Sequence, residues 1–437
     1  MKLLPTEGLW SGGLPIESAT ELSSYLSAGV QYPKVFIQQS LLGENPFGTL
    51  WLLDQLLDEN GHLTVQLESD VETLGEPELS ISALKAMTQD VGWEVLPHLT
   101  PWGEKLHALV FLKSALRSPP RYQCRPSEAL DVDENLQLFE RAFNESPSSS
   151  LWSWKYGQGQ SLSMLALRDS RLVAHYGCIS RRLHDRGLST RAVQICDVMV
   201  EPSERGVLTR AGAFFCAARA SQLAIIGWRD DHAFGFGFPN QRHMILGERL
   251  GLYTTVDHMT ERRWTPHRGK PSPWKTVRPL LEGPRQDLEI DQLWSAMSSD
   301  MKDKIIGVRD ASYIRDRYLR HPTKRYLLYV LKSRWLSKPL GLMILRRDEN
   351  LCRLVDFVAP LSMIPDLIEM ARRLAWEFGS HALVTWITAS QASHFDVLSP
   401  LSVPLDIKIP ANTLITRVQP DEIRGRWWLM MGDTDFM

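Results

Sequence analysis

One segment constrains the fold of this chain most. It is a short apolar strand that ends at a proline and leads through a tight turn into a helix. Gln194 to Val200 is an apolar run, Pro202 ends it, and helical spacing runs from Ala211 to Ile226. Between the two, Arg205 and Gly206 supply a turn with a cation. Backbone N–H groups at such a helix start attract anions, because they have no partner inside the helix. The segment therefore predicts a strand, turn and helix that bind a phosphate or pyrophosphate group.

This segment resembles the GNAT superfamily of N-acetyltransferases. The central strand of that superfamily has the form D-hydrophobic-x-V-x-P-x-x-R-G, which Asp197 to Gly206 reproduces. The next strand of the superfamily leads to an asparagine and a Leu-Gly-Phe-like corner. Phe236 to Asn240 and Leu250 to Leu252 stand at those places here. The resemblance implies an α/β fold with GNAT-like α+β units.

The phosphate turn departs from the superfamily pattern at both ends. The superfamily usually carries Gln or Arg, then two residues, Gly, one residue, and Gly or Ala. The three corresponding positions here hold Ser203, Gly206 and Leu208, so only the middle glycine matches. A leucine at the last position limits how closely the backbone approaches a phosphate, whereas Thr209 and Arg210 offer a variant loop.

The resemblance implies acetyl-coenzyme A as the acyl donor and no metal ion. The thioester carbonyl is expected at backbone N–H groups of the central strand, at Val198, Met199 and Val200. The remaining cofactor-binding positions implied by the resemblance are Arg205, Gly206, Val207, Leu208, Thr209, Arg210 and Asn240. The alternative is an ordinary strand, turn and helix whose arginines are solvated.

Acyl transfer from a thioester to an amine needs a group that accepts the amine proton. Asp197 is the only acidic residue within the predicted strand, and it is the predicted general base. The structural alternative is a buried carboxylate that binds neighbouring backbone or pairs with Arg181 or Arg182.

The leaving thiolate needs a proton as well, and its donor is less defined. Many relatives place a tyrosine seven residues after the asparagine, and that position here is Gly247. Tyr253 and Tyr176 are the candidates that remain, and each has the alternative role of a core or rim aromatic. His243 and His175 are weaker candidates, because an isolated histidine is more often only hydrogen-bonded.

Length and composition restrict the class of protein. A chain of 437 residues suggests two to three domains, and a formal net charge of −2 without a long basic run argues against nucleic-acid binding. The five cysteines are scattered and odd in number, which indicates neither a disulfide framework nor a metal site. No apolar run reaches membrane-spanning length and residues 1–5 lack a signal-peptide core, so a cytoplasmic location is expected.

Residues 1–118 alternate strand-like and helix-like stretches, with a turn expected at Asn60-Gly61 and two final strands expected to pair antiparallel. This order resembles the carboxy-terminal half of a class I S-adenosylmethionine-dependent methyltransferase, on the segments Leu56 to Gly61 and Val91 to Val95. No G-x-G turn follows a strand here, although the cofactor site of such enzymes needs one. The region is therefore interpreted as a degenerate half-Rossmann domain.

Two GNAT-like units are expected after this region, at residues 126–268 and 285–437, each preceded by a Pro-rich linker. One pattern occurs twice in the chain: a short segment of aromatic and basic residues, followed by strands. The two copies align when Tyr156 is placed opposite Tyr318, at a spacing of about 160 residues. In the second copy the strand runs into Ala359 to Pro365 without an Arg-Gly turn. That copy is expected to lack the thioester site and to serve as a structural or acceptor-binding half.

The predicted function is an acetyl-coenzyme A-dependent N-acetyltransferase that acts on a small-molecule amine. Analogy with tandem proteins of bacterial surface-polysaccharide synthesis suggests an amino sugar or a sugar nucleotide. Trp152, Trp154 and Tyr156 could stack on such a ring, and core packing is their alternative role. The alternative functions are a non-catalytic tandem scaffold and an aminoacyl or peptidyl transferase. The oligomeric state stays open.

Overall fold

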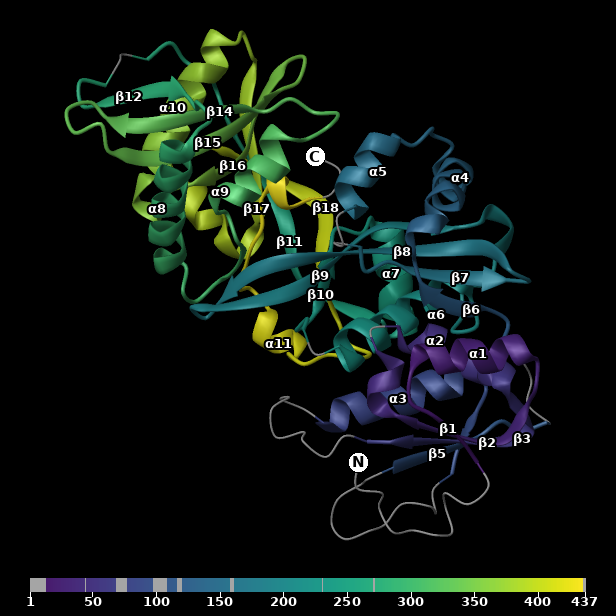
Figure 1. The fold of residues 1–437 in the computed structure, drawn as a ribbon. Helices are drawn as coiled ribbons and strands as arrows, with labels where there is room; N and C mark the ends of the chain where they lie inside the picture. Colours follow the sequence, from purple (N-terminus) through teal and green to yellow (C-terminus); the bar gives the residue numbers. More distant parts are fainter. Residues whose placement is uncertain are drawn as a thin grey trace.

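The computed structural model describes residues 13–43, 45–67, 77–96, 108–115, 120–157, 161–229, 231–269 and 272–434, with side chains from residue 80 onward in the third of these ranges. Residues 1–5 and the start of the first linker lie outside these ranges. The described residues form three sheets; in Figure 1 the first lies in the purple to blue amino-terminal part, and the second and third share the rest of the chain. The chain therefore has the mixed α/β architecture expected from the sequence.

The first sheet has the strand order β1-β2-β3-β5-β4 and belongs to the amino-terminal region. Its strands are β1 (Leu14–Ile16), β2 (Tyr32–Gln38), β3 (Leu57–Gln66), β4 (Glu94–Val95) and β5 (Ala108–Leu112), and its helices are α1 (Ala19–Ala28), α2 (Pro46–Leu56) and α3 (Pro77–Asp90). β1, β2 and β3 run parallel, and β5 lies antiparallel between β3 and β4. The antiparallel pairing of the last two strands is confirmed.

Asn60 and Gly61 lie in an irregular stretch of β3 where the chain folds back, as the sequence predicts: the register with β2 jumps from Leu57 to His62, and a Cβ atom at Gly61 would lie 2.7 Å from the Asp58 carbonyl oxygen. The Asn60 N–H donates to the Lys113 carbonyl at 2.7 Å, and the Lys113 N–H donates to the Gly61 carbonyl at 2.9 Å. Asn60 takes a φ of 63°, a left-handed conformation that asparagine tolerates. The hydrogen bonds to Lys113 thus hold this turn against the segment after β5.

The second sheet contains the segment that resembles the acetyltransferases. Its main strands are β6 (Gln123–Pro126), β7 (Met164–Arg168), β8 (Arg171–Asp185), β9 (Leu188–Val200) and β10 (Gly235–Gly237). Helices α4 (Val132–Phe143) and α5 (Ser149–Tyr156) cover one face, and α6 (Ala213–Ser221) and α7 (Gln241–Leu250) cover the other (Figure 1). After Ser221 the helix continues as the π-helical segment η5 (Gln222–Trp228), so it extends slightly beyond the expected end at Ile226.

The third sheet has the order β12-β14-β15-β16-β17-β11-β18. Its strands are β11 (Tyr253–Trp264), β12 (Lys275–Pro279), β14 (Leu327–Ser333), β15 (Pro339–Arg347), β16 (Leu351–Val358), β17 (Ala382–Thr388) and β18 (Leu401–Asn412). The helices around it include α8 (Pro284–Asp300), α9 (Ala311–Ile314), α10 (Ile364–Glu377) and α11 (Pro420–Ile423). α10 connects the parallel neighbours β16 and β17, as the short crossover of a βαβ unit does.

The second and third sheets exchange strands. β11 follows α7 in the chain but pairs with β17 and β18 of the third sheet. In return, β13 (Ile305–Gly307) pairs with β8 and also with β19 (Trp427–Trp428), so the carboxy-terminal segment supplies a strand to the second sheet. The indole rings of Trp427 and Trp428 are fully buried. The second and third sheets therefore pack together as one structural unit rather than as two separate domains.

The order of elements repeats between these sheets. β7, β8, β9, α6 and β10 in the second sheet correspond to β14, β15, β16, α10 and β17 in the third. The Tyr156 hydroxyl donates to Asp197 Oδ2 at 2.7 Å, and the Tyr318 hydroxyl donates to Asp356 Oδ2 at 2.7 Å. The architecture is consistent with tandem GNAT-like units.

Candidate active site

A β-bulge in β9 shapes the centre of the candidate site. The register between β8 and β9 shifts between His175 and Gly177, and Asp197 takes a φ of 43°. A Cβ atom at Gly177 would lie 2.1 Å from the Cys196 carbonyl oxygen, so only glycine fits beside the bulge. β10 pairs with β9 only at Val193 to Ile195. Beyond the bulge, the β10 side of β9 is therefore unpaired.

The expected oxyanion positions fall on this unpaired stretch. The Glu201 N–H donates to the Val173 carbonyl of β8 at 2.8 Å. Because successive N–H groups of a strand point to opposite sides, Val198 and Val200 direct theirs away from β8. Met199 lies opposite His175 in the β8 register. Val198 also lines the cavity described below. Of the three positions that the resemblance implies, it is therefore the best placed to meet a thioester.

Asp197 has partners that the sequence did not indicate. Its Oδ2 atom accepts hydrogen bonds from Lys155 Nζ and from the Tyr156 hydroxyl, both at 2.7 Å. Burial alone would raise the pKa of Asp197, but the Lys155 charge and these hydrogen bonds outweigh it and hold that pKa below the ordinary value. The suggested pairing with Arg181 or Arg182 is wrong, because those side chains reach Tyr313 and Asp310 instead. The role of Asp197 as a base stays a prediction.

The turn between β9 and α6 is anchored by Glu204. The buried Glu204 carboxylate accepts hydrogen bonds from the Tyr122 hydroxyl and Arg168 Nη1, both at 2.7 Å, and from Arg121 Nη2 at 3.0 Å. The Tyr122 hydrogen bond is the largest influence that holds the pKa of Glu204 below its ordinary value. Its partners stand 36 to 83 residues away in the chain, so no local sequence signal identified this residue.

The turn presents a run of backbone donors. Within the described part of the chain, the N–H groups of Gly206, Val207, Leu208, Thr209 and Arg210 have no hydrogen-bond partner. A Cβ atom at Gly206 would meet open space, and the Leu208 side chain is 49% exposed, so it points outward rather than filling the turn. Several unpaired N–H groups before a helix start form a site for an anion.

The Arg205 side chain is hydrogen-bonded to backbone carbonyls beside the same turn. Its Nε atom donates to the Val200 carbonyl at 3.0 Å and its Nη2 atom donates to the Ala142 carbonyl at 2.6 Å. The guanidinium group is exposed and carries an unneutralised charge beside the turn. Arg210 lies over the Phe215 ring, 5.9 Å from its centroid. The structure therefore brings both predicted cations to the turn.

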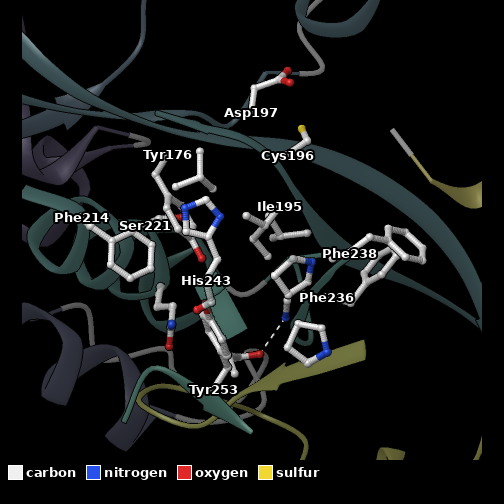
Figure 2. A pocket seen from close by; sticks show the side chains of 18 of the residues that line it. Tyr176, Ile195, Cys196, Asp197, Phe214, Ser221, Phe236, Phe238, His243 and Tyr253 are labelled. Carbon is white, nitrogen blue, oxygen red and sulfur yellow. Dashed lines mark hydrogen bonds between the residues drawn. The ribbon is translucent and has the colours of Figure 1, made fainter. Parts of the chain in front are cut away.

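A cavity of about 460 Å³ opens beside the bulge, between the sheet and the helices of its α6/α7 face. Figure 2 shows Tyr176, Phe214, His243 and Tyr253 on this side of β9, whereas the Asp197 carboxylate points to the opposite face. Asn240 borders the opening, and its side chain caps α7 by accepting the His243 N–H at 3.0 Å. A donor in the cavity and an amine arriving on the Asp197 face would meet at the bulge.

The two tyrosine candidates differ in their hydrogen bonds. The Tyr253 hydroxyl donates to the His243 carbonyl at 2.8 Å, and its ring occupies the space beside Gly247. A Cβ atom at Gly247 would lie 1.9 Å from Tyr253 Cζ, which explains why no tyrosine stands there. The Tyr176 hydroxyl lines the cavity and has no hydrogen-bond partner among the described residues. Burial raises the pKa of Tyr176 well above its ordinary value, so its proton stays on at neutral pH.

The aromatic cluster of α5 packs rather than opening to solvent. Trp152 and Tyr156 are buried between α4 and β9. Trp154 donates through Nε1 to the Asp316 carbonyl at 2.9 Å and packs against His321 at a centroid distance of 4.5 Å and an interplanar angle of 49°. Trp154 thus connects α5 to the unit of the third sheet, and these contacts favour the packing role over sugar stacking.

Comparison with known proteins agrees with this geometry. Residues 123–210 match the family model of the acetyltransferase (GNAT) domain. A protein of unknown function from Enterococcus faecalis V583, described as a probable N-acyltransferase, superposes with a TM-score of 0.53 at 13% identity, over 68% of this chain and 74% of its own. No curated protein sequence matches the chain.

Two further structures are similar. GCN5-related N-acetyltransferases from Anabaena variabilis ATCC 29413 and Kribbella flavida have TM-scores of 0.53 and 0.50 at 11% and 12% identity. Each alignment spans 67% of this chain, and 73% and 71% of theirs respectively. At such identity the likeness shows the fold, and together with the matched domain it supports an acyltransferase.

The described residues form neither a membrane-spanning helix nor a metal-binding cluster. Their helices are too short or too polar to cross a membrane. Among the same residues, no three His, Cys, Asp or Glu side chains are grouped so that they could hold a metal ion.

Proposed function

We propose that this chain is an acyl-coenzyme A-dependent N-acyltransferase whose donor site is the cavity and turn of the second sheet. The proposal rests on one observation: the turn and the cavity adjoin each other along the chain. The turn, with its five unpaired N–H groups, directly follows β9, and Val198 of β9 borders the apolar cavity. A coenzyme A thioester has this division of chemistry, with a pyrophosphate at one end and an uncharged arm at the other. Acetyl-coenzyme A is the donor expected from the sequence.

The chemistry at the bulge divides among three groups. The Val198 N–H would stabilise the oxyanion that forms when the amine attacks the thioester carbonyl. Asp197, on the opposite face, would accept the amine proton, and Tyr176 would donate a proton to the leaving thiolate. The acceptor is a small-molecule amine, and the amino sugar or sugar nucleotide suggested by analogy stays a proposal.

All five cysteines are free thiols, which fits a reducing compartment such as the cytoplasm.

Replacing Arg205 by alanine should weaken coenzyme A binding about tenfold or more, because a charge-assisted phosphate contact contributes about 1.5–3 kcal/mol. Isothermal titration calorimetry with acetyl-coenzyme A on the intact chain measures this. Arg186→Ala is the matched control, since Arg186 is an exposed arginine at the β8–β9 hairpin. Equal affinity of the Arg205 variant and the wild type would contradict the placement of the pyrophosphate. Absence of any coenzyme A binding would favour the non-catalytic scaffold.

We infer that residues 285–437 form a second GNAT-like unit without a donor site, and that β11 is the strand by which the unit of residues 126–268 joins it. After β16 only a short segment separates the strand from α10. There the Leu361 N–H donates to Asp300 Oδ2 at 2.8 Å, which places a carboxylate where an anion would have to bind. Asp356 is buried against Arg309, with Nε–Oδ1 at 2.9 Å. These contacts support a structural role for this unit.

For residues 1–118 we propose a degenerate, methyltransferase-like half-Rossmann unit. The support is topological: β5 is inserted antiparallel between β3 and β4 at the end of a parallel run. We expect no S-adenosylmethionine binding, because no glycine-rich turn follows a strand in the described part of this unit. Saturable binding in a titration of the intact chain would contradict this expectation.

A further inference from the structure

The cavity extends along β9 well past the position proposed for the thioester. Its wall includes Val198 near the phosphate turn and Val193 five residues earlier. A strand rises about 3.3 Å per residue, and the bulge at Asp197 takes up one of the five steps, so these positions are about 13 Å apart along β9. An acetyl group held at Val198 reaches only the beginning of this length. The inner part of the cavity would stay empty with acetyl-coenzyme A bound.

The inner part of the cavity is apolar. Val193 and Ile195 of β9, Ile225 and Ile226 of η5, and Phe236 of β10 line it. The π-helical geometry of η5 begins where the helix reaches this wall, and such segments recur at functional sites. An unfilled apolar cavity costs stability in proportion to its volume. An occupant that is itself apolar would offset that cost.

The polar side chains of the inner wall are already satisfied by the protein. Gln222 Nε2 donates to the Leu252 carbonyl at 3.2 Å, and its Oε1 accepts the Ile415 N–H at 3.3 Å. Asn412 Oδ1 accepts the Gly235 N–H at 2.7 Å, and its Nδ2 donates to the Ile415 carbonyl. The Ser221 hydroxyl lies 3.2 Å from Cys178 Sγ. These groups serve the fold, so they select against a polar occupant rather than for one.

We propose that the inner part of this cavity binds the acyl chain of the donor, and that the donor is an acyl-coenzyme A with a chain longer than acetyl. This inference rests on the proposed function and names the chemical class of its donor. The chain would run from the thioester at Val198 toward Val193, between β9 and η5. The reaction is then transfer of this acyl group from sulfur to the amine nitrogen, with the amine proton lost and the thiolate released as the thiol.

A chain-length series tests the proposal on the intact protein. Calorimetry would measure the dissociation constants of coenzyme A and of acetyl-, hexanoyl- and octanoyl-coenzyme A. Each methylene that becomes buried should tighten binding about fourfold, so octanoyl-coenzyme A should bind at least about 100-fold more tightly than acetyl-coenzyme A. Ile195→Phe should fill the inner part and reduce the octanoyl-to-acetyl affinity ratio, measured within the variant, to less than about tenfold.

The matched control is Ile245→Phe, the same change on an exposed residue of α7 outside the cavity. This variant should keep the full chain-length gain, which separates the cavity from general hydrophobic adsorption. If coenzyme A binds but longer acyl chains do not bind more tightly, the acyl-chain proposal is overturned while the proposed function stands. If no coenzyme A species binds, both fail. If Ile195→Phe does not fold, the wild-type series alone decides.

Discussion

Replacing Asp197 by asparagine is expected to lower acyl transfer about 100-fold while leaving coenzyme A binding unchanged. The loss follows if the carboxylate accepts the amine proton. Binding should survive because the Asp197 side chain points away from the donor cavity (Figure 2). The activity difference between variant and wild type should shrink at high pH, where more of the amine is already neutral. Single-turnover rates across pH, with calorimetry in parallel, measure both expectations.

Stability measurements separate a base from a structural carboxylate. Asp197 neutralises Lys155, which is 8% exposed, so removing the carboxylate should cost about 3 kcal/mol of unfolding free energy. Because the pKa of Asp197 is lowered in the folded protein, this contribution is complete above the carboxyl pKa of the unfolded chain and is lost as the pH falls through the lower folded value. Tyr156→Phe removes the hydroxyl that contacts Asp197 and Cys196 Sγ but keeps the Lys155–Asp197 charge pair, and it serves as the control. Full activity of Asp197→Asn at neutral pH would rule out the base.

Replacing Tyr176 by phenylalanine is expected to lower acyl transfer by about 100-fold, with the fold and the donor affinity retained. By register, Tyr176 lies between His175 and Gly177, opposite the bulge. Its ring remains in the variant, so packing against Phe214, at a centroid distance of 6.3 Å, is preserved. Single-turnover transfer from acetyl-coenzyme A measures the effect on chemistry apart from binding.

Tyr253→Phe is the matched control for this experiment. The Tyr253 hydroxyl already donates to a backbone carbonyl, so its loss should change transfer much less than the loss of the Tyr176 hydroxyl. A large effect at Tyr253 with none at Tyr176 would reverse the assignment of the acid. Equal activity of both variants and the wild type would show that the thiolate leaves without a dedicated proton donor.

Much of the donor site was predictable because it is built from neighbours in the chain. The apolar run to Val200, the proline after it and the Arg-Gly turn predicted the strand, the turn and α6 within a few residues. Asn240 was recognised after the next strand, and the structure shows that it caps α7. Such features depend on backbone conformation and on residues three or four apart, which sequence patterns report directly.

The partners that hold the site together were not predictable. Lys155 and Tyr156 meet Asp197 across 42 and 41 residues, and the nearby Arg181 and Arg182 were the wrong choice. In the same way, Glu204 finds Tyr122 across 82 residues. Which distant side chains meet is decided by how helices pack on a sheet, and no spacing rule encodes that.

By itself, then, the amino-acid sequence determined the α/β class, the order of elements in the second and third sheets, and the strand and turn that would meet a pyrophosphate. Periodicity, proline and glycine specify these features locally. Only the tertiary structure decided that β11 crosses to the third sheet, that Asp197 is paired with Lys155, and that a deep apolar cavity continues past Val198. These features arise where segments far apart in the chain bury their surfaces together, and that burial is a property of the whole packed body.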